Sequence, residues 1–170
     1  MENKLNTYLE LSIKAAIAAG DKILEIYSTA FEVLYKADHS PITLADTSAN
    51  KIILNFLRAT DLLVISEESE IPIFKDRIRH EYFWLIDPLD GTKEFVGRNG
   101  EFTINIALIQ NNKPVLGVVF CPVSDVLYYG LEYQGSYRII SAAKRYSNKS
   151  DFSEYLHLSE KLPCNKVSEY

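Results

Sequence analysis

The sequence has little cysteine, little histidine and a deficit of positive charge. Its 170 residues include two cysteines, three histidines, and 18 Lys plus Arg against 23 Asp plus Glu, for a formal net charge of −5. Two cysteines make neither a disulfide framework nor a zinc site, which indicates a reducing compartment. The acidic balance disfavours nucleic acids and anionic membranes as partners. The histidines show no ligand spacing, and no Ser/His/Asp or Cys/His arrangement is visible.

Long hydrophobic runs and a signal-like segment are also missing. The longest apolar run, residues 115–121, is too short to cross a bilayer, and the polar start of the chain shows no signal peptide. Apolar residues make up 47% of the chain and charged residues 24%, which is typical of globular proteins. We therefore expect a cytoplasmic protein with no membrane partner, long enough to bury a core.

Hydrophobic periodicity predicts two long helices and a series of short strands. Apolar residues at three- and four-residue spacing indicate helices over 3–27 and 43–58. After residue 140 the chain is rich in serine and lysine, and we expect no regular element there. The elements together predict an α+β fold, an antiparallel sheet with both helices on one face. The predicted strands are 31–35, 62–65, 82–86, 102–109, 115–121, 126–130 and 137–140.

Carboxylates directly follow two of the predicted buried strands. Glu67 and Glu68 follow the strand at 62–65, and Asp87 and Asp90 follow the strand at 82–86. Carboxylates that converge at strand ends repel one another unless a hard cation binds, and Mg²⁺ prefers oxygen ligands. The alternatives are a solvated acidic loop at the first position and a plain β-turn at the second. The occurrence of both features together favours a metal site.

Two threonines mark helix starts that have both a structural and a functional interpretation. Gly91 and Thr92 open a predicted short helix, and helix N–H groups bind phosphate. Thr92 is either a helix cap or the residue that orients an attacking water. Asp46 lies three residues after Thr43, so it is either part of a capping box or the residue that accepts a proton from Thr92. The sequence leaves these alternatives open.

Three motifs resemble those of the inositol monophosphatase superfamily of magnesium-dependent, lithium-sensitive phosphatases. Residues 84–92 (WLIDPLDGT) resemble its metal motif, residues 66–69 (SEES) its glutamate motif, and residues 36–46 (KADHSPITLAD) its third motif. The match continues through residues 100–108 to about residue 140. Lys93 and Glu94, which directly follow residues 84–92, resemble the version of the motif found in the 3′(2′),5′-bisphosphate nucleotidase branch.

This resemblance implies a function and a set of site residues. The implied activity is hydrolysis of adenosine 3′,5′-bisphosphate to AMP and phosphate, a step of sulfate assimilation, with two or three Mg²⁺ ions in the complete family site. The alternative activity is that of an inositol-phosphate or related sugar phosphatase. The implied metal ligands are Glu67, Asp87, Asp90 and the carbonyl of Leu89. The other implied roles are water positioning by Glu67 and Thr92, support of Thr92 by Asp46, and phosphate binding by the N–H groups of Gly91 and Thr92.

The resemblance covers the first half of the layered αβαβα family fold. Family members carry a second α/β half whose Trp-Asp pair completes the second metal site, whereas the only tryptophan here, Trp84, precedes Leu85. We therefore expect residues 1–140 to form the metal- and phosphate-binding domain and residues 141–170 to lead toward an absent second domain. We further expect the chain as given to be a catalytically weak metal-binding half-domain that self-associates through its uncovered apolar face.

Overall fold

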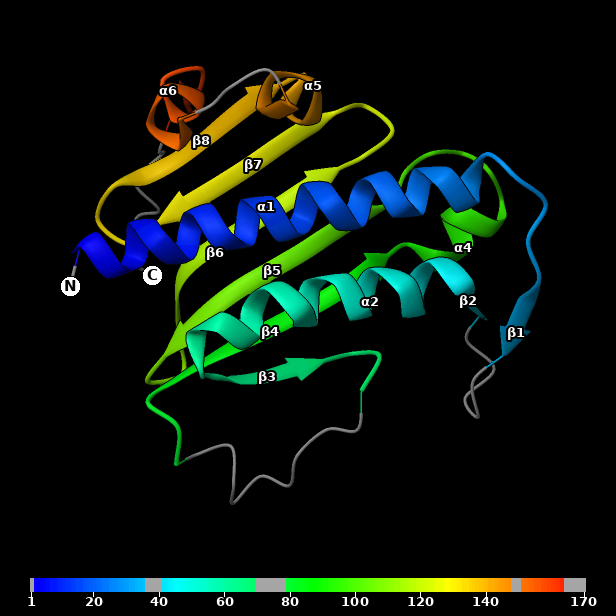
Figure 1. The fold of residues 1–170 in the computed structure, drawn as a ribbon, viewed down its shortest axis with the longest axis horizontal. Helices are drawn as coiled ribbons and strands as arrows, with labels where there is room; N and C mark the ends of the chain where they lie inside the picture. The colour runs from blue at the N-terminus through cyan, green and yellow to red at the C-terminus, as the bar shows by residue number, and fades with distance from the viewer. Residues whose placement is uncertain (1, 36–40, 70–78, 148–150, 164–170) are drawn as a thin grey trace, which may run out of the picture.

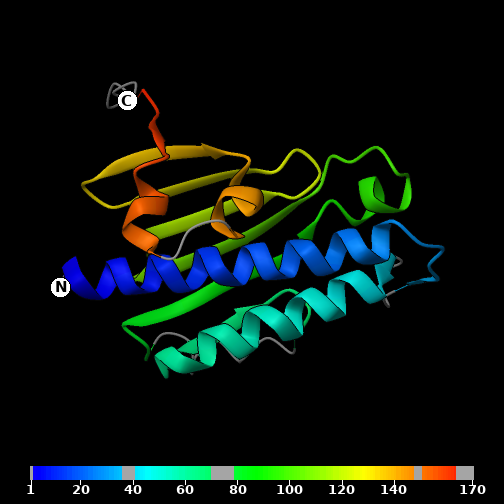
Figure 2. The same ribbon diagram turned by 45° about the horizontal axis from the view of Figure 1, so that its top comes forward.

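The computed structural model describes residues 2–35, 41–69, 79–147 and 151–163. One seven-stranded sheet carries two long helices, α1 (Glu2–Tyr27) and α2 (Leu44–Leu57), which lie side by side across the same face (Figures 1 and 2). Both helices are confirmed within two residues of their predicted ends. The short helix after Gly91 is also confirmed, as α4 (Thr92–Val96). A 3₁₀ turn, η1 (Arg58–Thr60), follows α2.

The strands of the large sheet lie in chain order, and all but one pair are antiparallel. The exception is the edge pair, in which β3 runs parallel to β4. The prediction of a wholly antiparallel sheet is therefore wrong at this edge, because a buried apolar run looks the same in either orientation. The strands are β3 (Leu63–Ser66), β4 (Tyr82–Asp90), β5 (Thr103–Gln110), β6 (Lys113–Cys121), β7 (Val126–Leu131), β8 (Gly135–Ile140) and β9 (Glu160–Lys161).

A separate two-stranded ribbon leads into α2. Strand β1 (Val33–Tyr35) pairs antiparallel with β2 (Pro41–Thr43), and β2 ends at the residue that caps α2. The sequence predicted β1 but not β2, because β2 has only three residues, one of them a proline, and so shows no periodicity. Residues 36–40 of the third motif lie outside the described part of the chain.

The segment after residue 140 contains regular elements, so the prediction of none is wrong. Helices α5 (Ala142–Ser147) and α6 (Phe152–Leu156) precede β9, which pairs with β8. Ala142 and Tyr155 are fully buried and join the core. Helices of five or six residues contribute too few core positions to produce a readable pattern. A second domain beyond this segment stays a prediction.

The core lies between the helices and the sheet. Its largest fully buried side chains include Trp84, Phe95, Phe102 and Phe120. Gly20 brings α1 close to β6, because a Cβ at this position would collide with the ring of Phe120. None of the helices in the described residues has the length and apolarity needed to cross a membrane.

The sheet face away from α1 and α2 carries exposed apolar side chains. Leu85 is 46% exposed and Ile140 50% exposed on this face. A shallow hollow of about 480 Å³ on this face is lined in part by Leu85, Ala107, Gly117 and Val119. Self-association through this face stays a prediction.

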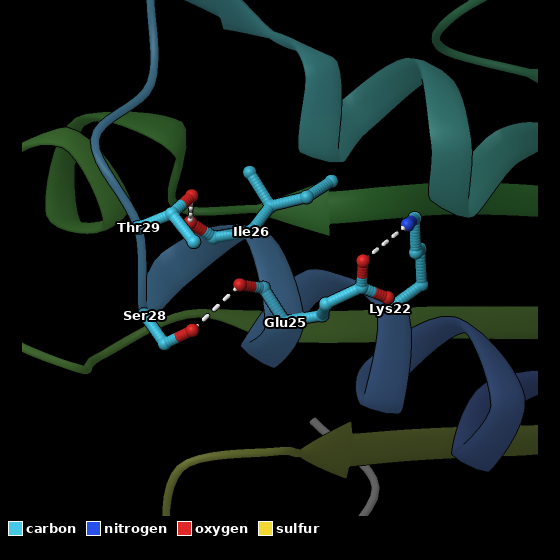
Figure 3. Close-up of polar contacts among 5 residues, drawn as sticks. All are labelled: Lys22, Glu25, Ile26, Ser28 and Thr29. Carbon is cyan, nitrogen blue, oxygen red and sulfur yellow. Dashed lines mark hydrogen bonds and ion pairs between the residues drawn. The ribbon is translucent and has the colours of Figure 1, made fainter.

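The last turn of α1 accepts hydrogen bonds from the two residues that follow the helix and from a distant loop. Ser28 and Thr29 each donate a hydroxyl to the carbonyl three residues earlier, at 2.7 and 2.9 Å, and Lys22 pairs with Glu25 at 2.8 Å (Figure 3). Arg98, which follows α4, donates to two further carbonyls at this end, at 2.7 and 2.5 Å. The helix end is thereby tied to the loop that follows α4.

Candidate metal centre and active site

A bulge in β4 places two aspartates on the same face of the sheet. Asp87 pairs with Asn105, and Asp90 pairs with Thr103. The chain therefore advances by three residues on β4 while it advances by two on β5, which is the extra residue of a bulge. Side chains three residues apart otherwise point to opposite faces of a strand, and the extra residue of a bulge reverses that alternation. Both carboxylates therefore emerge on the face away from the long helices. Residues 87–90 are strand rather than the plain turn of the alternative interpretation.

The parallel strand β3 brings Glu67 beside Asp87. The backbone N–H of Glu67 donates to the carbonyl of Ile86 at 3.2 Å, and the Glu67 and Asp87 side chains share a hydrogen bond. Burial, together with the negative charges of Glu67 and Asp90, raises the pKa of Asp87 to about 7. Two of the predicted carboxylate groups, one from each strand end, thus meet as the sequence predicted.

Buried hydrogen bonds hold the turn that carries Glu67. Ser66 is 2% exposed, and its hydroxyl donates to Oδ1 of Asn50 on α2 at 2.8 Å. The same hydroxyl accepts from the backbone N–H of Glu68 at 3.2 Å, and the Asn50 amide reaches Ser69 at 3.4 Å. The end of β3 is therefore fixed to α2, while Glu67 itself is exposed.

The donor chemistry of this edge suits a hard divalent cation. Glu67, Asp87, Asp90 and the carbonyl of Leu89 offer oxygen ligands of the kind that Mg²⁺ takes. As the side chains stand, no three Asp, Glu, His or Cys residues within the described ranges close around an ion position. Glu67 and Asp87 instead share a hydrogen bond, and Asp90 accepts from β5. Burial, and then the negative charges of Glu67 and Asp90, raise the pKa of Asp87, and a bound cation would oppose this rise by stabilising the ionised carboxylate.

One carboxylate of Asp46 makes the contacts that both of its predicted roles require. Its Oδ2 accepts from both the N–H and the hydroxyl of Thr43, each at 2.7 Å, which forms the capping box of α2. Its Oδ1 accepts from the hydroxyl of Thr92 at 2.9 Å. Asp46 is 1% exposed, and these hydrogen bonds give both of its buried carboxylate oxygens a partner. The structural and the functional interpretation are therefore compatible.

The start of α4 requires glycine and frees Thr92 from capping. Gly91 has φ +95°, and a Cβ there would lie 3.0 Å from the carbonyl oxygen of Glu101 and 3.3 Å from Cα of Phe102. Gly91 occupies the N-cap position itself, and the Thr92 hydroxyl points to Asp46. The helix-cap alternative for Thr92 is therefore wrong.

Most of the predicted site residues line one cavity of about 270 Å³. Asp46 does not line this cavity but contacts Thr92, which does. Asp87 lines the neighbouring 480 Å³ hollow, and Glu67 lines both. A larger groove of about 600 Å³ beside the end of α1 contains Thr43 but none of the predicted site residues. The smaller cavity is lined by Pro41, Glu67, Leu89, Asp90, Gly91, Thr92, Lys93 and Glu94.

Sequence reasoning missed Asn105. Its amide Nδ2 donates to Oδ2 of Asp90 at 3.1 Å, and it pairs with Asp87 in the ladder. Asn105 sits in the alternating run at 102–109, where a polar residue on the solvent side is ordinary. Its relevance depends on the bulge and register, which the pattern does not contain.

Comparison with known proteins agrees with the motifs. A sequence model of the inositol monophosphatase family matches residues 4–165. The chain belongs to this family. Like other family members of known structure, it combines a large sheet with packed helices: it superposes on the crystal structure of CysQ from Bacteroides thetaiotaomicron with a TM-score of 0.80 at 38% identity, covering 96% of this chain and 60% of that one. The predicted α+β class is confirmed.

Within the inositol monophosphatase family, the matched sequences include bisphosphate nucleotidases. The 3′(2′),5′-bisphosphate nucleotidase CysQ of Salmonella typhimurium is 50% identical over 128 residues, covering 73% of this chain and 52% of the relative. The protein of that name from Buchnera aphidicola is 37% identical over 178 residues, covering 95% and 67%. The chain spans about half the length of the curated relatives that match it with highest identity.

The raised pKa of Asp87 predicts a pH-dependent stability of the metal-free chain. The folded state keeps a proton up to a pH of about 7 that the unfolded state releases near the ordinary value of 3.8. This stabilisation is therefore complete at low pH and is lost as the pH rises through about 7. We expect the melting temperature in EDTA to fall from pH 5 to pH 8, and to fall less in Asp87→Asn. Equal declines in the two proteins would contradict this origin.

Proposed function

We propose that the complete protein is a Mg²⁺-dependent phosphomonoesterase that hydrolyses adenosine 3′,5′-bisphosphate to AMP and phosphate. The observation that carries the proposal is the hydrogen bond from Thr92 to buried Asp46, beside the carboxylate edge formed by Glu67, Asp87 and Asp90. Membership of the inositol monophosphatase family and the nucleotidase names of two relatives support it. A role in sulfate assimilation, in the cytoplasm, is part of the same proposal.

The chain's own residues would divide between holding metal and handling water. Glu67, Asp87, Asp90 and the Leu89 carbonyl would hold Mg²⁺, which when bound activates water and stabilises the leaving oxygen. Thr92 donates its single hydroxyl hydrogen to Asp46, at 2.9 Å rather than the 3.3 Å to Leu89. A water at this hydroxyl must therefore donate to it, which turns a lone pair of that water away from Thr92.

Phosphate binding is assigned to the start of α4. Gly91 and Thr92, whose N–H groups the family resemblance assigns to phosphate, both line the 270 Å³ cavity. The positive φ of Gly91 and the absence of a side chain let a phosphate approach this backbone. The assignment rests on the family resemblance together with this position.

Substrate choice supplies the test of the proposed activity. Lys93 and Glu94, the pair that resembles the nucleotidase branch, both line the cavity. We expect faster phosphate release from adenosine 3′,5′-bisphosphate than from inositol 1-phosphate at matched Mg²⁺, measured with a colorimetric phosphate assay. The reverse order would favour the alternative, an inositol-phosphate or related sugar phosphatase.

We propose as the alternative that the chain as given is a catalytically weak metal-binding half-domain. This alternative agrees with the extent of the match, which covers 52% of the relative from Salmonella typhimurium. Mg²⁺ binding without turnover of either substrate would support this half-domain interpretation.

A further inference from the structure

We propose that Asn105 is a positioning residue that holds Asp90 as a metal ligand, with Thr103 orienting the Asn105 amide. The inference rests on the proposed metal site and adds a residue to it that lies outside the metal motif, the glutamate motif and the third motif. Three side chains form a chain of hydrogen bonds on β4 and β5. The Thr103 hydroxyl donates to Oδ1 of Asn105 at 3.3 Å, and Nδ2 of Asn105 donates to Oδ2 of Asp90 at 3.1 Å.

The chemistry of the partners fixes which end of the amide faces Asp90. An ionised carboxylate only accepts hydrogen bonds, so the amide must present its NH₂ group to Asp90. The carbonyl end of Asn105 then faces Thr103, whose hydroxyl donates to it. The hydrogen bond to Asp90 engages one carboxylate oxygen, Oδ2, which sets the plane of the carboxylate and leaves Oδ1 as the oxygen for a cation.

An amide is the type of group that this position requires. A lysine or arginine beside Asp90 would neutralise its charge and compete with a cation for the carboxylate. The amide orients the carboxylate while leaving its negative charge in place, the charge that contributes to the raised pKa of neighbouring Asp87. Groups that hydrogen-bond to ligating carboxylates orient them in this way in metal sites.

The backbone explains why Asn105 reaches Asp90 rather than its own ladder partner. Asn105 pairs with Asp87, whereas Asp90 pairs with Thr103, two residues further along β5. The bulge puts all of these side chains on the same sheet face, where a diagonal neighbour is within reach. Asn105 thus spans the two aspartates that the bulge brings together.

The test measures Mg²⁺ affinity in the absence of substrate, by isothermal titration of the 170-residue chain. Asn105→Leu keeps the size of the side chain and removes the donor, and we expect a dissociation constant about 10–100-fold higher. The matched control is Gln110→Leu at the far end of β5, which removes an equivalent amide donor to Glu81 (3.0 Å). The control should bind Mg²⁺ like the parent, and both variants should melt alike in EDTA.

Thr103→Val provides a second, independent variant. Because Thr103 acts through the amide, its removal should weaken Mg²⁺ binding in the parent and have no further effect in Asn105→Leu. Unchanged affinity in both single variants, or no Mg²⁺ binding by the parent, would overturn the inference. The expected differences in a chain that releases no phosphate would support the role of Asn105 together with the half-domain interpretation.

Discussion

Replacing Asp87 by asparagine is expected to abolish most of the stabilisation that Mg²⁺ gives to this chain. Asp87 lies between Glu67 and Asp90, and both of these carboxylates raise its pKa. Asparagine keeps the shape but removes the charge that a divalent cation needs. Loss of a group that only orients a ligand costs about 10–100-fold in affinity, so loss of a ligand should cost at least about 100-fold.

The measurement is the melting temperature with increasing Mg²⁺. A ligand at about 100 times its dissociation constant stabilises the folded state by about 2.7 kcal/mol, and an affinity at least about 100-fold weaker in Asp87→Asn should reduce this increment to about 0.4 kcal/mol or less. Asp61→Asn is the matched control, because Asp61 is exposed and lies at the far end of α2, in a left-handed conformation that asparagine also adopts. An equal Mg²⁺ shift in Asp87→Asn and the parent would reject the metal assignment.

Thr92→Val is expected to lower kcat for phosphate release from adenosine 3′,5′-bisphosphate by about 10²–10⁴-fold. This is the usual contribution of a side chain that assists a reacting water. Valine keeps the branched shape and removes the hydroxyl that donates to Asp46 at 2.9 Å. Asp46→Asn should lower the rate in the same direction, and Thr92→Ser should retain most of it. Because the hydroxyl is not among the proposed ligands, the Mg²⁺ shift in melting temperature should stay close to that of the parent.

Thr47→Val is the control for this second prediction. Thr47 lies on α2 one residue after Asp46, and its hydroxyl makes a local 3.3 Å hydrogen bond to the Leu44 carbonyl. Loss of that hydroxyl should leave the rate unchanged. An unchanged rate in Thr92→Val under the same assay would show that Thr92 only links α4 to α2.

The sequence was sufficient for those features that depend on local pattern. The two long helices follow from apolar residues at three- and four-residue spacing, and the capping box of α2 from the spacing of Thr43 and Asp46. The acidic residues at the ends of two strands could also be predicted from local pattern, because a buried strand is apolar and polar residues begin where it ends.

Features that depend on pairing between distant segments were not predictable in this way. The parallel orientation of β3 and the bulge between Asp87 and Asp90 are properties of the ladder. Asn105 acquires its contact with Asp90 only through that register. The short elements after residue 140 depend on tertiary burial of single residues such as Tyr155.

The central claim is that the carboxyl ends of β3 and β4 form a divalent-cation site. Its most direct test is anomalous diffraction from crystals of this chain soaked in Mn²⁺, which takes the same oxygen ligands as Mg²⁺. The account predicts an anomalous peak in contact with the carboxylates of Glu67 and Asp87 and the carbonyl of Leu89. Mn²⁺ bound elsewhere on the chain, with no peak at these three residues, would contradict it.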